Sequence, residues 1–595
     1  MNTLLWIVSG VALYTVLVLL LRQRGLLPSS LKVQGPLMTI HTRRGREFLE
    51  WLSTPKRFWR AWSNVGVGIT LVIMVGTFVL LVLRSVQIVQ NPPAPTAVNA
   101  PRNVLVIPGV NDFLPLSVAP EILLGLLVGL VVHEGGHGLL CRVEDIDIES
   151  MGLVLFTVLP IGAFVEPDEE SQRNASRGGR TRMFAAGVTN NLAITAIALA
   201  LLFGPVTGAI AASPGAAVGS TFPNSAAADA GIESGDRIVG FDGTNVTSDA
   251  DLRNALESND AANVTVTMSD GTERTVQRSL LVTAMSPNSP LAADGEAGVS
   301  TNDTIVAVNG TSVNTESGLR EAVADKPIAT LTVEDRAGEE STVSGPIGVL
   351  LAVSPDGPLS EQTDVPGGEQ VVVTSIDGQR TLDYSDVQSA LDGGEPGDEV
   401  NVTAYVDGEL RTYEVTLAEA NDGTGRGLVG VTQGPELSGI GVNSLGVVPY
   451  PAEQFLSILG GDIQGGLFSQ VLFILFLPFA GTVVPGIDAN FAGFVATNAN
   501  FYTVSGPLAA LGGGVFLLAN ALFWVGWVNL NLAFFNCIPA YPLDGGRILR
   551  TSTEAVVSRL PVEGRQELTS AITTSIGLIM LASLLLLLFG PQLLA

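Results

Sequence analysis

The sequence predicts a polytopic α-helical membrane protein with about six transmembrane helices and one large, polar α+β insert. Three observations lead to this fold class: a mean hydropathy of +0.41, several apolar stretches close to the roughly 20 residues that cross a bilayer, and a long acidic region between them. The candidate spans are 3–21, 65–83, 115–140, 183–203, a stretch within 506–535, and 572–588.

Basic residues assign the two sides of the membrane. Arg22 and Arg24 follow the first span, which lacks a small-residue cleavage site, so we expect an anchor and not a removed signal peptide. Because Lys and Arg favour the cytoplasmic side, we expect the basic loops inside and the N-terminus and the insert outside. These loops are 43–60, 173–182, and the region around Arg547 and Arg550.

Two further segments are expected at the membrane without crossing it. Trp51, Trp59 and Trp62 lie near several arginines and indicate an amphipathic segment at the membrane interface. Gly465–Ala480 is apolar but short, and as a full span it would bring the next helix in from the wrong side. We therefore interpret it as re-entrant or interfacial.

The charge is strongly negative, with 57 Asp and Glu against 30 Lys and Arg, and only three lysines. The acidic excess lies between about 212 and 439. Such a surface repels phosphates and excludes nucleic-acid binding. It is typical of proteins adapted to high salt, as in halophilic archaea, although an acidic extracellular domain would also account for it.

The insert contains an internal repeat. AGIESGDRIVGFDG, ending at Gly243, aligns without gaps on AGVSTNDTIVAVNG, ending at Gly310, and a weaker third copy ends at Gly378. The closing glycines are 67 and 68 residues apart, and eight residues after each the sequence indicates a short helix. Strand-like alternation follows the first and third helices. A fixed period with constant offsets predicts three small repeated domains.

The chemistry is carried by HEGGH, at the end of an apolar run. Two of the three histidines in the chain are His133 and His137, and a spacing of four places both imidazoles on one helix face, where they can share a zinc ion. Glu134 is placed to take a proton from a water at that ion. One HExxH match can arise by chance, so a second motif is needed.

That second motif is NCIPAYPLDGG, at 536–546. A catalytic zinc takes three protein ligands and keeps a position for water. Asp544 is an acid placed after a long apolar helix, where a charge is costly unless it is paired or metal-bound. Prolines break the helix, and Gly545 and Gly546 permit a close backbone approach. This geometry would bring Asp544 to the two histidines.

HEGGH in one membrane helix, NCIPAYPLDGG in another and the repeats between them resemble the site-2 protease family of intramembrane zinc metalloproteases. GLVLFTVLPIGAFVEPDEE at 152–170 resembles the membrane-associated β-hairpin of that family, and MFAAGVTNNL at 183–192 resembles its next helix. The repeats resemble PDZ domains, which bind extended peptides by strand addition. The first copy matches well, the second fairly, and the third only in its second half.

The resemblance implies that His133, His137 and Asp544 hold Zn²⁺ and that Glu134 is the general base. Fe²⁺ or Co²⁺ could fill the same ligands. Asn536 is, by resemblance, a substrate-backbone contact. Asn191 is a candidate for a similar task, with a helix–helix hydrogen bond as the alternative.

The glycines near the motifs and the two cysteines are expected to have structural roles and not to bind the metal. Gly135, Gly136 and Gly545 are expected to leave room for water around the ion. Cys141 and Cys537 each lie beside a motif, but their expected role is that of small core residues.

The leading function is hydrolysis of a peptide bond within or near a transmembrane helix of a membrane-anchored substrate, in regulated intramembrane proteolysis. The alternative is a non-catalytic, PDZ-bearing membrane scaffold; a zinc transporter would need more acidic or His residues along the spans. Expected partners are the substrate, the bilayer and, for the PDZ-like domains, peptides; the expected location is the cell membrane, with the active site near the cytoplasmic face.

The expected division of the chain follows these motifs. It is 1–64 for the anchor and basic loop, 65–114 for the second span and external loop, 115–211 for the first catalytic part, 212–285, 286–350 and 351–440 for PDZ-like domains one to three, 441–505 for the re-entrant or interfacial segment, 506–560 for the second catalytic part, and 561–595 for the last span.

Overall fold

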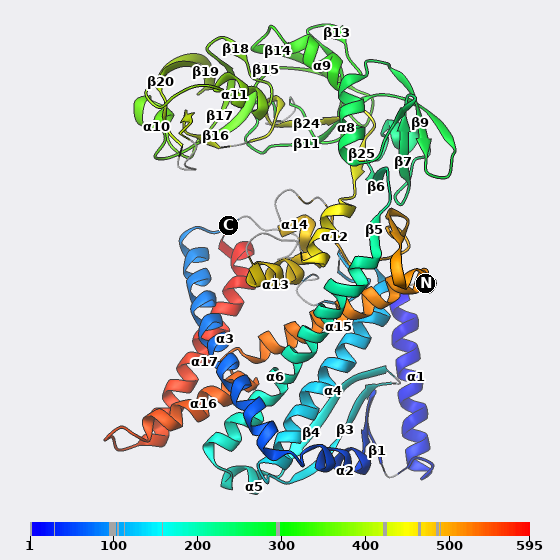
Figure 1. Cartoon of the computed structure of the whole chain (residues 1–595), viewed down its shortest axis with the longest axis vertical. Coiled ribbons are helices and arrows are strands. Elements are labelled where there is room, and N and C mark those ends of the chain that lie inside the picture. Colours follow the sequence, from blue (N-terminus) through cyan, green and yellow to red (C-terminus); the bar gives the residue numbers. More distant parts are fainter. Residues whose placement is uncertain are drawn as a thin grey trace. The chain divides into compact units, whose positions relative to one another are not determined.

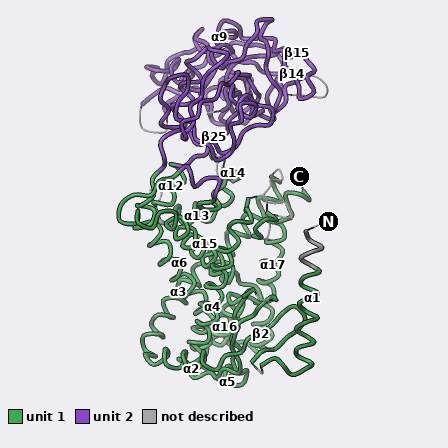
Figure 2. The backbone as a smooth tube through the Cα atoms, turned by 90° about the vertical axis from the view of Figure 1, so that its right-hand side faces the viewer, with its two compact units in different colours: residues 1–211, 453–495, 502–595 green, residues 212–452, 496–501 purple. Residues whose placement is uncertain are grey.

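A computed structural model describes the chain as two compact units (Figure 2). Unit 1 contains 1–211, 453–495 and 502–595, and unit 2 contains 212–452 and 496–501. The described residues are 3–594 except 29, 94–102, 104–105, 112, 158, 293–297, 421–424, 433, 462–465, 484–486 and 488.

Unit 1 is built on long apolar helices (Figure 1). Among the described residues, five helices are long and apolar enough to cross a membrane: Lys56–Gln90, Leu116–Val143, Arg177–Ala209, Gly514–Asn536 and Arg565–Leu594. They contain α3 (Lys56–Gln90), α4 (Ala119–Val143), α6 (Arg177–Leu201), α15 (Gly514–Asn536) and α17 (Arg565–Leu594). The sequence predicted about six spans. The remaining predicted span, 3–21, falls in α1 (Thr3–Gln23), a helix of 21 residues.

Helices α4, α6 and α15 pack together in the middle of unit 1 (Figure 1). Glycines allow this close approach. A Cβ added at Gly125 of α4 would lie 2.7 Å from the Trp524 carbonyl oxygen of α15, and one at Gly136 would lie 2.9 Å from the Ala186 oxygen of α6. Small residues at helix interfaces are a usual means of packing membrane helices. The central helices are therefore held at short distances by backbone-to-backbone contact.

A four-stranded antiparallel sheet lies against α4. Its order is β1 (Leu31–Gln34), β2 (Leu37–His41), β3 (Ile148–Phe156) and β4 (Leu159–Pro167). The hairpin of β3 and β4 confirms the prediction for 152–170. Strands β1 and β2 were not predicted from the sequence. They form in the chain that follows α1 and so make that part of the chain two strands of the sheet. Strand β4, one of the two edge strands, packs along α4.

Shorter elements complete unit 1. They are α2 (Arg43–Leu52), α5 (Glu169–Asn174), α12 (Ala452–Gly460), α13 (Gly466–Phe476), α14 (Ala480–Val483), α16 (Asp544–Val557), and the pair β5 (Ile210–Ala212) and β26 (Tyr502–Val504). Helix α13 has 11 residues and continues through a 3-10 turn, Leu477–Phe479, into α14; the re-entrant or interfacial position expected for Gly465–Ala480 stays a prediction. Gly465 itself lies outside the described residues.

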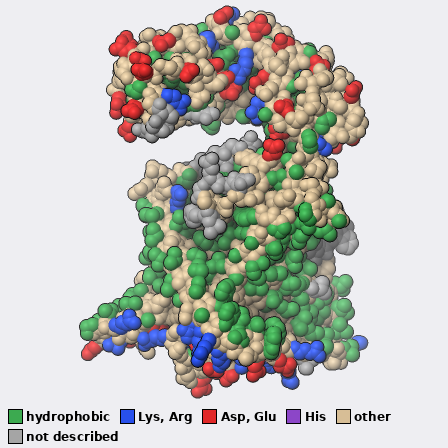
Figure 3. All heavy atoms as spheres, viewed as in Figure 1, with side chains coloured by type: hydrophobic (Ala, Val, Ile, Leu, Met, Phe, Trp, Pro, Cys, Tyr) green, Lys and Arg blue, Asp and Glu red, His purple; other side chains and the backbone are tan. Residues whose placement is uncertain are grey.

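Hydrophobic side chains cover the visible flank of unit 1, and Lys and Arg gather at one end, over α2, α5 and the connection between α16 and α17 (Figure 3). The basic loops expected on one side of the membrane thus lie at one end of this unit.

Unit 2 contains three antiparallel sheets of one design. The first has the order β10-β9-β7-β6-β25, the second β15-β14-β12-β11-β24, and the third β20-β19-β17-β16-β23. Their strands are β6 (Ala216–Thr221), β7 (Arg237–Phe241), β9 (Asn263–Met268) and β10 (Glu273–Gln277); β11 (Leu280–Met285), β12 (Thr304–Val308), β14 (Ile328–Glu334) and β15 (Glu340–Pro346); and β16 (Val349–Val353), β17 (Gln370–Ile376), β19 (Glu399–Val406) and β20 (Glu409–Thr416). A two-residue strand pairs with each third strand: β8 (Thr244–Asn245), β13 (Thr311–Ser312) and β18 (Gln379–Arg380). The second sheet begins at Leu280, ahead of the predicted boundary at 286.

The predicted repeat is confirmed in its turns and helices. The residue before each closing glycine has a positive φ, as does the glycine, at Asp242, Asn309 and Asp377. Such Asx-Gly pairs fit the tight turn that joins two twisted strands. The helices are α8 (Asp249–Ser258), α9 (Glu316–Val323) and α11 (Tyr384–Ala390), capped by the side chains of Ser248, Thr315 and Asp383. These caps satisfy backbone N–H groups of the first turn.

One segment after the third repeat closes all three sheets. It supplies β23 (Val431–Thr432), β24 (Ile440–Asn443) and β25 (Val447–Pro449), which pair with the edges of the third, second and first sheets in turn. We call 427–450 the return segment. Because it completes three sheets in reverse order, no repeat is complete within its own stretch of sequence.

A buried arginine joins the first repeat, the second repeat and the return segment. Arg278 has a fully buried side chain and donates to Glu316 Oε2 at 2.6 Å and to Ser444 Oγ at 2.8 Å. Glu316 also accepts from the Ser444 backbone N–H at 2.6 Å. A buried charge needs a partner and further hydrogen bonds, and both are supplied here.

Candidate metal centre

Helix α4 places two imidazoles side by side in the packed interior of unit 1. His133 and His137 are 6% and 8% exposed, and their Nε2 atoms are 3.2 Å apart. The spacing of four along a helix brings both rings to one face, as predicted. Their location between α4 and α6 keeps bulk water away.

Asp544 reaches the same point from the opposite end of the sequence. It is the first residue of α16 and is 4% exposed, and a helix N-terminus favours a negative charge. The chain folds back tightly before it. A Cβ on Gly545 would collide with the Ile538 oxygen, and one on Gly546 would lie 2.6 Å from the Ala540 carbonyl carbon. The two glycines therefore permit the close approach expected from the sequence.

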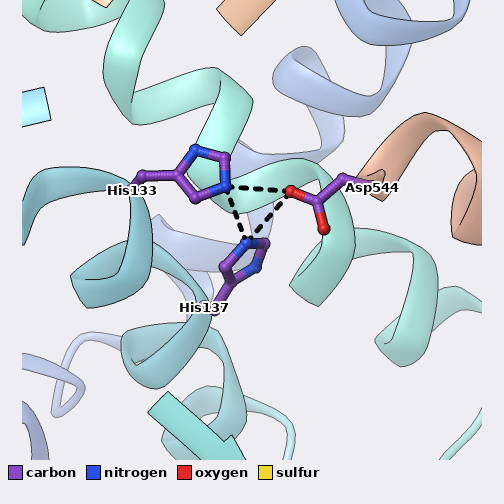
Figure 4. A group of neighbouring side chains, drawn as sticks. All are labelled: His133, His137 and Asp544. Atoms are coloured by element: carbon purple, nitrogen blue, oxygen red, sulfur yellow. Dashed lines mark hydrogen bonds and ion pairs between the residues drawn. The ribbon is translucent and has the colours of Figure 1, made fainter. Parts of the chain in front are cut away.

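The three ligand atoms form a nearly regular triangle (Figure 4). Asp544 Oδ2 lies 3.0 Å from His133 Nε2 and 3.1 Å from His137 Nε2. Bonds of about 2.1 Å to a tetrahedral ion separate ligand atoms by about 3.4 Å, close to this spacing. The group is buried and could hold a metal ion.

The hydrogen bonds of the outer ring nitrogens fit such an ion. His137 Nδ1 lies 2.8 Å from the Met183 carbonyl oxygen, which can only accept, so Nδ1 carries a proton; in the neutral ring this leaves the lone pair on Nε2, where it can face a cation. Asp544 Oδ2 is buried, and its only close polar neighbours among the described residues are the two imidazole Nε2 atoms. When both rings are neutral, the two Nε2 atoms and Asp544 Oδ2 are acceptors that face one another, and a cation between them would stabilise this arrangement.

Asn191 orients the other imidazole. Its Nδ2 is 3.3 Å from His133 Nδ1, and its Oδ1 is buried without a hydrogen-bond partner in the described part of the chain. Turning the amide over would place Oδ1 where it accepts the Nδ1–H of a ring whose Nε2 faces a cation. The contact of Asn191 is thus with His133, and its predicted contact with a substrate stays a prediction.

Gly187, four residues before Asn191, makes room for His133. A Cβ at Gly187 would lie 2.6–2.8 Å from three atoms of the imidazole. The G-x-x-x-N pattern in the sequence therefore has two physical roles at one histidine: the glycine admits the ring, and the asparagine orients it.

Glu134 faces a different side of α4. Its Oε2 accepts a hydrogen bond from the Val165 N–H of β4 at 3.1 Å, and it lines a cavity of about 610 Å³. Of the three glycines expected to leave room around the ion, Gly135 borders open space at this cavity, where an added Cβ would meet nothing within 4 Å; that this space reaches the ion stays a prediction. The expectation is wrong for Gly136 and Gly545, whose open sides are filled by Ala186 of α6 and by Ile538.

Asn536 ends α15, and its side-chain Nδ2 donates to the Leu532 carbonyl oxygen at 2.9 Å. Its predicted contact with a substrate backbone stays a prediction. Cys141 and Cys537 are free and buried, and both pack in apolar clusters, as expected of core residues.

A group of ion pairs at the end of α4, formed by Glu144 with Arg60 and Arg182, was not predicted from the sequence; we call it the charged clamp. Glu144 accepts from Arg182 Nε at 2.9 Å and from Arg60 Nε at 3.0 Å, and Arg60 Nη2 also donates to the Val143 carbonyl oxygen at 3.1 Å. Burial, the largest single influence, raises the pKa of Glu144, but the hydrogen bonds and charges of Arg182 and then Arg60 outweigh it and leave that pKa below its usual value. The clamp ties α4 to α3 and α6. The sequence showed that the loops carrying these arginines are basic, but it did not indicate that the two arginines pair with Glu144.

Comparison with known proteins decides the family. The sequence model of peptidase family M50 matches residues 121–584, which include both motifs and the insert between them. This chain belongs to peptidase family M50, the site-2 protease family. The family resemblance predicted from HEGGH and NCIPAYPLDGG is thereby confirmed, and the M50 family is one of zinc metalloproteases.

This M50 member is also similar to a curated archaeal protein. An uncharacterized protein, MJ0971, from Methanocaldococcus jannaschii is 28% identical over 176 residues, which is 29% of this chain and 45% of that relative. The chain thus matches less than half of the length of this relative.

Proposed function

We propose that this protein is an intramembrane zinc metalloprotease that hydrolyses a peptide bond within or near a transmembrane helix of a membrane-anchored substrate. The observation that carries the proposal is the convergence of His133, His137 and Asp544 on one buried point between apolar helices. A scaffold derived from a protease would have no need to keep three mutually facing acceptors.

In this proposal the three residues hold Zn²⁺, which, when bound, polarises the scissile carbonyl and lowers the pKa of water to about 7. Fe²⁺ or Co²⁺ would suit the same donors. The chain prepares the ligands: Met183 fixes the tautomer of His137, and Asn191 fixes that of His133.

Glu134 is the proposed general base. Its carboxylate takes a proton from the attacking water and later gives it to the leaving amine. The Val165 N–H holds one carboxylate oxygen at 3.1 Å, which fixes the direction of the side chain and leaves the other oxygen for the water.

The decisive variant is Glu134→Gln, compared with wild-type protein on a membrane-anchored substrate in vesicles. The proposal expects cleavage to fall by at least about 10³-fold while the metal content stays the same, because the amide cannot accept the proton. Glu121→Gln, a carboxylate lost from the start of the same helix, is the control and should cleave normally. Undiminished cleavage by Glu134→Gln refutes the base assignment; scaffold or transport activity would survive the change.

For the repeats of unit 2, we propose the PDZ-like role indicated by the sequence, either as a size filter or in binding the new C-terminus of a shortened substrate, in regulated intramembrane proteolysis. Strands β23, β24 and β25 each end a sheet, so each has an edge to which an extended peptide could add. In this proposal unit 1 lies in the cell membrane. The basic residues at one end of unit 1 support a cytoplasmic position for that end, and the insert is then extracytoplasmic.

The filter is tested by removing the whole insert, 213–451, with the return segment included. Substrates that have not been shortened should then be cleaved. If selectivity between full-length and shortened substrates is unchanged, the filter role is refuted and the protease proposal stands.

A further inference from the structure

A cavity of about 610 Å³ lies between the N-terminal amphipathic segment and the helix that carries HEGGH. Its walls come from α2, the start of α3, α4, β3, β4 and α6, all within unit 1. Cavities of roughly 300–1,000 Å³ hold drug-sized ligands. This one therefore has room for a short stretch of peptide.

The outer wall is aromatic. Phe48 of α2 and Trp59 and Trp62 of α3 line the cavity. Both indoles have satisfied N–H groups: Trp59 donates to the Leu52 carbonyl oxygen at 2.7 Å, and Trp62 donates to Asn190 Oδ1 at 3.1 Å. What remains for an occupant is the apolar surface of the rings. Trp59 and Trp62 were expected at the membrane interface, and here they form a wall.

The inner wall carries the reactive group. Glu134 lines the cavity, and the next residue, Gly135, offers it open space, because an added Cβ would meet nothing within 4 Å. An apolar cavity with a single carboxylate, beside a buried pair of imidazoles, is suited to an apolar occupant that reacts at that carboxylate.

We propose that this cavity receives the bulky apolar side chains that flank the scissile bond of the substrate, and that the amphipathic segment 43–62 is a specificity wall. The inference rests on the proposed protease function and adds the substrate class: a membrane segment with large apolar residues beside the cleaved bond. A lipid acyl chain shares this apolar chemistry, and the experiment separates the two.

The test is a graded series, Gly135→Ala, Gly135→Val and Gly135→Leu, in the full-length protein reconstituted in vesicles. Two anchored substrates are used that differ only at the residues flanking the cleaved bond, Leu and Phe in one, Ala and Gly in the other. Gly68→Leu is the matched control, because Gly68 of α3 is exposed and a Cβ added there also meets nothing within 4 Å.

The inference expects kcat/KM for the bulky substrate to fall by about 10-fold with Val and about 100-fold with Leu, in each case by more than the loss for the small substrate. Metal content should stay constant along the series. Phe48→Ala, in the opposite wall, is a second probe away from HEGGH and should reduce the preference for the bulky substrate by a few-fold. Gly68→Leu should leave the preference unchanged.

Three results overturn the inference. Equal losses for both substrates would mean that bulk at Gly135 acts on Glu134 and not on an occupant. An unchanged preference with a change in co-purifying lipid would assign the cavity to an acyl chain. Wild-type protein that cleaves neither substrate would overturn the protease proposal and this inference together, whereas wild-type cleavage with an unchanged preference overturns the inference alone.

Discussion

The membrane unit and the acidic insert are both assembled from distant pieces of sequence, but in different ways. In unit 1, α4 and α16, 400 residues apart along the chain, meet so that His133, His137 and Asp544 converge on one point. In unit 2, three copies of one small sheet are each completed by a strand from the return segment. The proposed chemistry therefore depends on a few side chains, whereas the insert depends on shared backbone pairing.

The most extensive structural effect is expected for the return segment. Replacing 427–449 with a Gly/Ser chain of equal length should open all three sheets of the insert, because β23, β24 and β25 are lost together. Hydrogen exchange in β6, β11 and β16 should speed up by at least about 10-fold in each. Acceleration confined to β16 would show that the repeats are independent, and the contrast between the two units would fail. Asp407→Asn, in an exposed turn, is the control.

In unit 1, a single added methyl group should be enough to impair cleavage and metal binding. Gly187→Ala places a Cβ within 2.8 Å of the His133 ring, which must move. Because a displacement of about 1 Å at a reacting site can cost 10²-fold, cleavage should fall by about 10²-fold or more, with loss of metal. Gly76→Ala in α3 is the control, since its Cβ would meet nothing within 4 Å. Normal cleavage by Gly187→Ala would contradict the tight packing of the centre.

A smaller effect is expected at Asn191. Asn191→Leu removes the group that orients His133 and should weaken metal binding by about 10–100-fold, measured by competition with a chelator. Asn191→Asp keeps an acceptor and should bind metal more tightly than Asn191→Leu. Equal binding by the two variants would assign Asn191 to helix packing or to substrate.

The smallest effect is a dependence on pH at the end of α4. The pKa of Glu144 is lowered in the folded protein, so its contribution to stability is present above its unfolded-state value and is lost as the pH falls through the folded-state pKa. The free energy of unfolding of unit 1 should therefore decrease toward acid pH, and Glu144→Gln should reduce that dependence. An identical acid dependence in the variant would remove Glu144 as its cause.

Much of unit 1 could be predicted because its signals are local. Apolar stretches indicated helices, and HEGGH and NCIPAYPLDGG named the three residues that the structure brings together. The neighbours of those residues were harder to predict. Nothing in the sequence points from Met183 to His137 or from Val165 to Glu134, because backbone groups carry no sequence signature.

The insert shows the complementary limit. Its turns and helices recur at fixed offsets and were predicted from Gly243, Gly310 and Gly378. Its closing strands were not, because β23 and β25 have only two and three residues, and such strands carry too little alternation to be recognised. Their pairing is set by long-range contact with the sheet edges.

The central claim is that one metal ion is held by His133, His137 and Asp544, and metal analysis of the purified full-length protein tests it most directly. We expect about one zinc per chain in the wild-type protein and a large loss in both His133→Ala and Asp544→Ala, with the helical content of unit 1 retained. A wild-type protein without bound transition metal, or an Asp544→Ala variant that binds as much as the wild type, would contradict the account.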